Sequence, residues 1–320
     1  MKNSFGGVIA SIAVLILNQG VRAAEVKLGN SGYAQIAQSQ NSEVKKTAGR
    51  TIILGLDADM SGSSAQSGEA IRRGAILAID EINAAGGVLG RPLKLEVRDH
   101  RGNPARGVDN IEDFSQMKDV VAVIGGIHTP VAMAELKSVH KNKMIYLGPW
   151  AAGTPVVANG FKPNFVFRVS VRDQYAGGFL INAAEKRGFK RPGLLLWRNA
   201  WGRSNETAMK NALKNSTSKL AGIQWFNSGA RDMAAQIDAL QAAGADVVML
   251  VANPGDGLVA VQSMANRPAA KRLPVISHWG ITGGDFFGQG RAAIEKIDLT
   301  FLQTYSFYDP PFPQKIRENL

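Results

Sequence analysis

From residue 51 onward the sequence alternates short apolar runs with longer segments of helical periodicity, and this alternation limits the possible folds more than any other feature. The first apolar run, residues 51–56 (TIILGL), is continuous, as in a strand buried on both faces. A segment with apolar residues at helical spacing follows and ends at Gly86 and Gly87, before an expected strand at 92–98. Repeated β-α-β units of this kind predict an α/β fold with parallel sheets and crossover helices.

The same rhythm restarts after residues 165–169, so the chain divides into two similar halves. The first half continues with alternating helices and strands, expected at residues 105–116, 120–124, 131–141 and 144–147. The second half alternates in the same way, at residues 174–187, 193–197, 205–215, 223–226, 233–243, 246–251, 258–264 and 274–277. We therefore expect two Rossmann-like lobes with a cleft between them, lobe 1 over residues 51–170 and lobe 2 over residues 171–303. Residues 304–320 are expected to return into lobe 1.

Residues 1–24 have the pattern of a cleaved secretory signal peptide. Lys2 supplies a positive start, residues 5–17 form an apolar run, and Ala23 and Ala24 offer small residues to a signal peptidase. The apolar run is shorter than the roughly 20 residues that a membrane span needs. Residues 25–50 are polar and lack a sustained period, which predicts a flexible leader. Because the chain has no cysteine, it has neither disulfides nor a lipid-anchored cysteine, and we expect a periplasmic location.

The residues needed for several other functions are missing from the sequence. The net charge is +11, but Lys and Arg are scattered and no basic run alternates with aromatics, so nucleic acid binding is not predicted. No phosphate-binding loop, zinc-binding H-E-x-x-H or G-x-S-x-G nucleophile motif is present. With no cysteine and only four histidines far apart in sequence, no metal or other cofactor is expected. His128 and His278 each follow an expected strand, so a hydrolase or lyase that uses either histidine is the alternative to a binding protein.

Glycine-bounded loops follow the expected strands, where ligands bind in open parallel sheets. These loops cover residues 125–130, 148–154, 199–202, 253–257 and 277–284. Their backbone N–H groups, hydroxyls and neighbouring helix N-termini suit an anionic group such as a carboxylate. Trp150, Trp201 and Trp279 lie in three of these loops and would supply flat apolar walls. Ahead of them, Ser67 stands where the N-cap of the first helix is expected, with Glu69 in the first turn.

Several motifs together resemble the branched-chain amino acid binding family, the type I periplasmic binding proteins of ABC importers. The most specific stretch runs from DMSG at residues 59–62 to DEINAAGGVLG at residues 80–90. The GG pair at 125–126, FRVS at 167–170, the WG pair at 201–202 and AGAD at 243–246 match as well. The resemblance implies two lobes that close on a small molecule, a membrane permease as partner and a monomer. A periplasmic sensor of the same fold is a second possibility that the resemblance leaves open.

Carried over position by position, the resemblance also implies a ligand site. Thr129 corresponds to a hydroxyl that meets the ligand carboxylate, and Thr154 to a possible second hydroxyl. Trp201 and Asn253 correspond to contacts from the second lobe. The full set of expected ligand-binding residues is Ser67, His128, Thr129, Trp150, Ala151, Ala152, Thr154, Trp201, Asn253 and Trp279.

Two departures from the family pattern change what we expect. Amino acid binders of this family hold the ligand ammonium with an acidic residue, and Trp279 stands at that position in this chain. A buried ammonium without a carboxylate is costly, so we expect a small carboxylate or amide with an apolar or aromatic body, unless Asp256 substitutes. Members of the family also continue with further helices beyond the position of Leu320. A truncated C-terminal part and exposed apolar surface are therefore expected.

Overall fold

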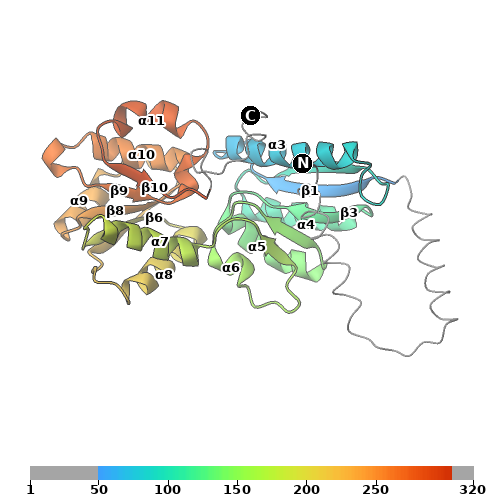
Figure 1. Cartoon of the computed structure of the whole chain (residues 1–320), viewed down its shortest axis with the longest axis horizontal. Helices are drawn as coiled ribbons and strands as arrows, with labels where there is room; N and C mark the ends of the chain where they lie inside the picture. The colour runs from blue at the N-terminus through green and yellow to red at the C-terminus, as the bar shows by residue number, and fades with distance from the viewer. Residues whose placement is uncertain (1–49, 305–320) are drawn as a thin grey trace, which may run out of the picture. The chain divides into compact units, whose positions relative to one another are not determined.

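Figure 1 shows the computed structural model of the chain, which describes residues 50–304. The expected signal peptide, the leader up to residue 49 and the return segment beyond Thr304 lie outside the described residues.

The first half of the described chain forms a parallel five-stranded sheet in the order β2-β1-β3-β4-β5. We call this sheet and its helices lobe 1. Its elements are β1 (Ile52–Ala58), α3 (Ala65–Ala84), β2 (Leu93–Asp99), α4 (Pro104–Gln116), β3 (Val120–Ile124), α5 (Thr129–Lys141), β4 (Ile145–Gly148), α6 (Thr154–Val157) and β5 (Val166–Arg168).

The second half forms another parallel five-stranded sheet, in the order β10-β9-β8-β6-β7, which we call lobe 2 with its helices. Its elements are α7 (Asp173–Lys186), β6 (Pro192–Trp197), α8 (Ala200–Leu213), β7 (Gly222–Phe226), α9 (Ala234–Ala242), β8 (Val247–Val251), α10 (Pro254–Ala265), η1 (Ala269–Lys271), β9 (Val275–Ser277), η2 (Trp279–Thr282), α11 (Phe286–Ile294) and β10 (Leu299–Phe301). The predicted α/β class with two parallel sheets is confirmed.

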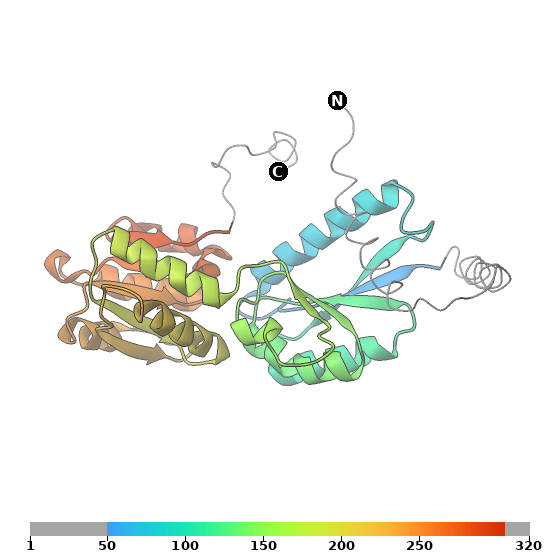
Figure 2. The ribbon, with the colours of Figure 1, turned by 60° about the horizontal axis from the view of Figure 1, so that its bottom comes forward.

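The sheet of lobe 2 is buried on both faces, as continuous apolar strands require. Figures 1 and 2 show α7 and α8 on one side of this sheet and α10 and α11 on the other. Met209 and Leu180 pack with β6 and β8 on the α7–α8 side, and Phe286 and Val261 pack on the α10–α11 side. All five residues of β8 (VVMLV) are buried.

The sheet of lobe 1 is covered less evenly. One face packs on α4 and α5 around Phe114 and Tyr146, while the small cluster on the other face joins Ile79 of α3 to β1 and β2. Phe167 of the edge strand β5 is 50% exposed, and Val169 directly after it is 83% exposed. Lobe 1 thus carries exposed apolar side chains at the edge strand β5 and directly after it.

The start of α3 differs from the prediction. The residue before the helix is Ser64, not Ser67, and no acidic residue lies in the first turn. The carboxylate of Asp59 holds this turn instead, because it accepts hydrogen bonds from the backbone N–H groups of Gly62 (2.6 Å) and Ser64 (2.9 Å). Ser67 therefore lies inside the helix and is buried.

Two helices of lobe 2 begin earlier than predicted. Helix α8 begins at Ala200 rather than residue 205, because the Asn199 side chain accepts a hydrogen bond from the Gly202 N–H (3.0 Å). Helix α10 begins at Pro254, and proline suits the first helical position. Trp201 and most of the 253–257 run therefore lie in first helical turns rather than in loops. None of the helices within residues 50–304 is long and apolar enough to cross a membrane.

Candidate functional site

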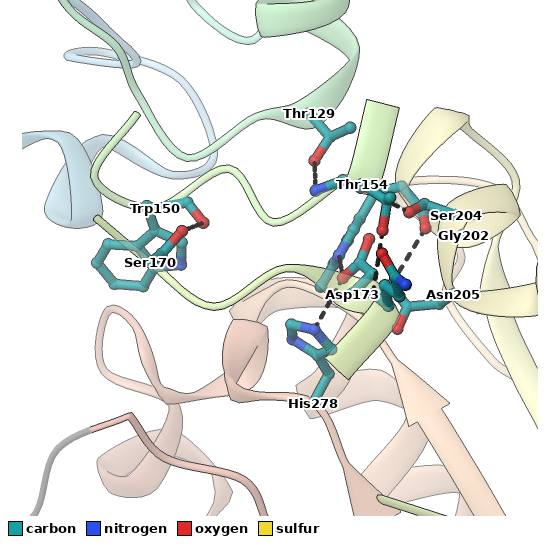
Figure 3. Close-up of polar contacts among 12 residues, drawn as sticks. Thr129, Trp150, Thr154, Ser170, Asp173, Gly202, Ser204, Asn205 and His278 are labelled. Carbon is teal, nitrogen blue, oxygen red and sulfur yellow. Dashed lines mark hydrogen bonds and ion pairs between the residues drawn. The ribbon is translucent and has the colours of Figure 1, made fainter. Parts of the chain in front are cut away.

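A fully buried carboxylate, Asp173, lies at the start of α7 and organises the residues around it. Its Oδ1 accepts a hydrogen bond from Trp201 Nε1 (3.2 Å) and lies 3.1 Å from His278 Nε2. In the tautomer that carries its proton on Nε2, His278 donates to this carboxylate oxygen. Figure 3 shows the contact between Asp173 and His278. The Trp279 ring lies against His278 with 3.8 Å between ring centroids and the ring planes tilted by 37°, so these side chains form one packed cluster.

The expected ligand-binding residues Trp150, Ala151, Ala152 and Thr154 belong to one stretch, residues 150–154, which is held by hydrogen bonds. Thr129 Oγ1 accepts from the Gly153 N–H (3.1 Å), and the Ala151 N–H donates to the Gly126 carbonyl (3.3 Å). The carbonyl of Ala152 accepts from the Asp173 N–H (2.9 Å). Figure 3 shows Thr129 bonded to this stretch. The N–H groups of Ala151 and Gly153 are thus already engaged, and Thr129 Oγ1 is engaged as an acceptor.

Thr154, at the end of this stretch, connects the two lobes. Its backbone N–H donates to Ser204 Oγ of α8 (3.0 Å), and its Oγ1 accepts from the Gln174 N–H of α7 (3.0 Å). Both helices belong to lobe 2, so the start of α6 is fixed by lobe 2 as well as by lobe 1.

Two of the three tryptophans that were expected to form apolar sides of a ligand site line one cavity. Trp150 and Trp279 border a space of about 450 Å³, together with Ser170, Thr282 and Gln303. No charged side chain lines this cavity. The indole Nε1 of Trp150 is buried and has no hydrogen-bond partner among the described residues. Trp201 is absent from the lining because it packs beside Asp173 and His278.

A second cavity, of about 330 Å³, joins Ser67 of lobe 1 to lobe 2. The first turns of α3, α10 and α11 all contribute to it, and Pro254 and Phe286 are among the lining residues. Ser67 Oγ is buried and has no hydrogen-bond partner among the described residues. Asn253 is buried immediately before α10, but its side chain does not cap the helix.

His128 belongs to a separate polar cluster in lobe 1. Its Nε2 lies 3.3 Å from Asp59 Oδ2, and its ring lies edge-on to Trp197 of lobe 2, with 6.4 Å between centroids. Burial raises the pKa of Asp59, but hydrogen bonds from His128 and two backbone N–H groups outweigh burial and lower it to about 2. Burial, followed by the neighbouring His128, lowers the pKa of His100 to about 4. His128 and His278 are therefore engaged by different carboxylates.

The structure thus distributes the predicted site residues over several places. Ser67 reaches one cavity, Trp150 and Trp279 reach the other, and the remaining residues lie in the 150–154 stretch or in buried clusters. Asp256 does not provide a free carboxylate, because its Oδ1 accepts from the Gly229 N–H (2.9 Å), and burial raises its pKa. Among residues 50–304, no group of three side chains is arranged to bind a metal ion.

Sequence reasoning missed Asp173, the partner of Trp201 and His278, and Ser204, the lobe 2 partner of Thr154. Asp173 begins a helix directly after the hinge-like residues 167–170, and an acidic residue in a first turn was the available signal. No comparable signal identifies Ser204, because its contact with Thr154 joins residues 50 positions apart.

This chain is similar to known proteins in both sequence and fold. A family model described as periplasmic binding protein matches residues 51–306. A Leu/Ile/Val-binding protein homolog from Brucella melitensis is 27% identical over 198 residues, which cover 62% of this chain and 53% of that protein. The chain therefore spans about half the length of this curated relative.

Solved structures share the fold at lower sequence identity. The substrate-binding protein of a branched-chain amino acid transporter from Streptococcus pneumoniae, in complex with isoleucine, aligns with a TM-score of 0.73 and 21% identity, covering 84% of this chain and 75% of that one. An ABC transporter solute-binding protein from R. palustris, in complex with 4-hydroxybenzoate, aligns with a TM-score of 0.68 and 20% identity, covering 76% and 66%. Since the family model spans both parallel-sheet lobes, this chain belongs to the periplasmic binding protein family.

Proposed function

We propose that this chain is the substrate-binding component of an ABC importer, which takes up a small molecule between its lobes and delivers it to a membrane permease. The observation that carries the proposal is the larger of the two cavities described above, which Trp150 and Ser170 of lobe 1 share with Trp279 and Thr282 of lobe 2. Ligand sites of parallel α/β folds lie in this position, beyond the carboxyl ends of the strands.

The lining of the larger cavity favours a ligand with an apolar or aromatic body and a carboxylate or amide group. Trp150 and Trp279 supply apolar surface, and Ser170, Thr282 and Gln303 supply uncharged polar groups. An ammonium in this cavity would lack a carboxylate partner, and Asp256 is already engaged elsewhere. Relatives of this fold have been solved with isoleucine and with 4-hydroxybenzoate, and the tryptophans favour the second kind of ligand.

The proposal includes a periplasmic location, a permease partner and a monomeric state. A periplasmic sensor would share the same site, so uptake has to be measured as well as binding. A hydrolase or lyase has less support. His128 and His278 are only 6% and 0% exposed, and each lies beside a buried carboxylate.

The test is a thermal melt of residues 25–320 with L-leucine, L-phenylalanine, benzamide, benzoate or 4-hydroxybenzoate. Benzoates or benzamide at about 100 times Kd should stabilise the protein by roughly 2.7 kcal/mol, which corresponds to a rise in Tm of roughly 5–10 °C. Stronger stabilisation by leucine would refute the proposed ligand class. Cells that lack the protein should lose uptake of the active probe if it serves an importer, and should keep uptake if it is a sensor.

A further inference from the structure

A buried glycine of lobe 2, Gly283, contacts lobe 1 at two of the predicted ligand-binding residues. A Cβ atom built on Gly283 would lie 2.6 Å from Ser67 Oγ and 3.8 Å from Trp150 Cη2. It would also lie 3.2 Å from Pro254 Cγ of lobe 2. The first distance is too short for two non-bonded atoms, so a side chain at this position could not be accommodated without movement.

Glycine is not required here by the backbone. Gly283 has φ −76° and ψ 168°, a conformation that any residue adopts. The next residue, Gly284, has φ +60°, where glycine is favoured for its conformational freedom. At Gly283 the reason for glycine is therefore space, which is limited most by Ser67 Oγ of lobe 1 at 2.6 Å and next by Pro254 Cγ of lobe 2 at 3.2 Å.

The two groups beside Gly283 are also unusual in their hydrogen bonding. Ser67 Oγ and Trp150 Nε1 are both buried, and neither has a hydrogen-bond partner among residues 50–304. Burying a polar group without a partner costs free energy, so this close approach is unfavourable for both groups unless another molecule supplies partners. A ligand with hydrogen-bonding atoms would offset that cost, which links the approach of Gly283 to the occupancy of the site.

We propose that Gly283 is the closure contact of the two lobes. Its missing side chain lets lobe 2 reach Ser67 and Trp150, and any larger residue at this position holds the lobes apart. The role in ligand binding rests on the function proposed above, whereas the steric limit on lobe approach does not.

The central experiment compares Gly283→Ala with Gly74→Ala. Gly74 lies in α3, the same helix as Ser67, and a Cβ on it would have no atom within 4 Å. Both variants should melt at or above the wild-type temperature in the absence of ligand, because alanine fits both backbones and restricts the unfolded chain. Gly283→Ala should weaken binding of the active probe from the five-compound panel by roughly 10- to 100-fold, and Gly74→Ala should leave it unchanged. Equal affinity of Gly283→Ala and wild type would overturn the inference.

A double-mutant cycle tests whether Ser67 is the residue that Gly283→Ala obstructs. Ser67→Ala removes the Oγ atom that lies closest to the added Cβ. In a Ser67→Ala background, Gly283→Ala should therefore weaken probe binding less than threefold further. A full 10- to 100-fold additional loss would show that the obstruction lies elsewhere.

The steric limit is measured without ligand by distances between spin labels. The chain has no cysteine, so cysteines introduced at Asp80 of α3 and Ala292 of α11, both exposed, can be labelled selectively. Wild type and Gly74→Ala should share a short-distance population that Gly283→Ala reduces at least fivefold. Identical distributions in all three proteins would refute the steric limit. If Gly283→Ala loses the short-distance population, the closure contact is supported. If wild type also binds none of the five probes, the proposed ligand class is refuted.

Discussion

Replacing Asp173 with alanine should destabilise the protein more than any surface change, because its carboxylate is the acceptor for two buried donors. Trp201 Nε1–H and His278 Nε2–H both lose their acceptor, at 3.2 Å and 3.1 Å. Each buried donor left unpaired costs about 1–3 kcal/mol, so Asp173→Ala should lower the free energy of unfolding by about 2–6 kcal/mol. Asp173→Asn keeps the size of the side chain and one carbonyl acceptor. This variant should therefore lower the free energy of unfolding by about half as much, roughly 1–3 kcal/mol.

The measurement is urea unfolding at pH 7 followed by tryptophan fluorescence, with the free energy extrapolated to zero urea. Asp80→Ala is the matched control, because Asp80 is an exposed residue of α3 and its loss should change stability by no more than about 0.5 kcal/mol. If Asp173→Ala loses no more stability than Asp80→Ala, the assignment of Asp173 as the central acceptor of the cluster is wrong.

Two further perturbations test other parts of the structure. Burial, followed by the neighbouring Glu135 carboxyl, raises the pKa of Asp57, so the native state keeps a proton that the unfolded chain releases above its ordinary pKa of 3.8. The free energy of unfolding should therefore fall as the pH rises above that value. Urea unfolding between about pH 5 and pH 9 should show a smaller dependence of this free energy on pH in Asp57→Asn than in wild type. An unchanged dependence would contradict the raised pKa of Asp57. A Cβ on Gly202 would clash with the Trp197 carbonyl oxygen, so Gly202→Ala should lower the free energy of unfolding by about 1–3 kcal/mol. A Cβ on Gly178 would have no atom within 4 Å, so Gly178→Ala should not lower it. Equal stability of these two variants would show that the start of α8 adapts freely.

The fold could be predicted from the sequence because buried parallel strands appear as continuous apolar runs. Residues 120–124 were expected as a strand and form β3 with the same bounds. Two elements near the end of the described chain were missed: β10 has only three residues, and α11 begins with FFGQG, in which two glycines obscure the helical pattern. The early start of α8 was missed because it depends on a hydrogen bond from the Gly202 N–H to the side chain of Asn199.

The site was less predictable, for a physical reason. Asp173 and His278 are 105 positions apart, and no spacing along the chain indicates that they meet. The role proposed for Gly283 depends on its lack of a Cβ atom. The sequence does not indicate this role, because it follows from the proximity of Ser67 Oγ in the folded protein. Trp150 and Trp279, by contrast, were predicted to lie close together, because loops at the carboxyl ends of parallel strands converge, and both line one cavity.

The uneven cover of lobe 1 has a consequence for how the protein behaves at high concentration. Strand β5 pairs with β4 on one side only and ends the sheet, so its outer edge can accept a strand from another chain. Natural proteins often protect such an edge with a charged side chain, but Arg168 donates to the Gly153 carbonyl instead (2.6 Å). With Phe167 and Val169 exposed beside it, we expect this edge to promote aggregation through added strands at high protein concentration.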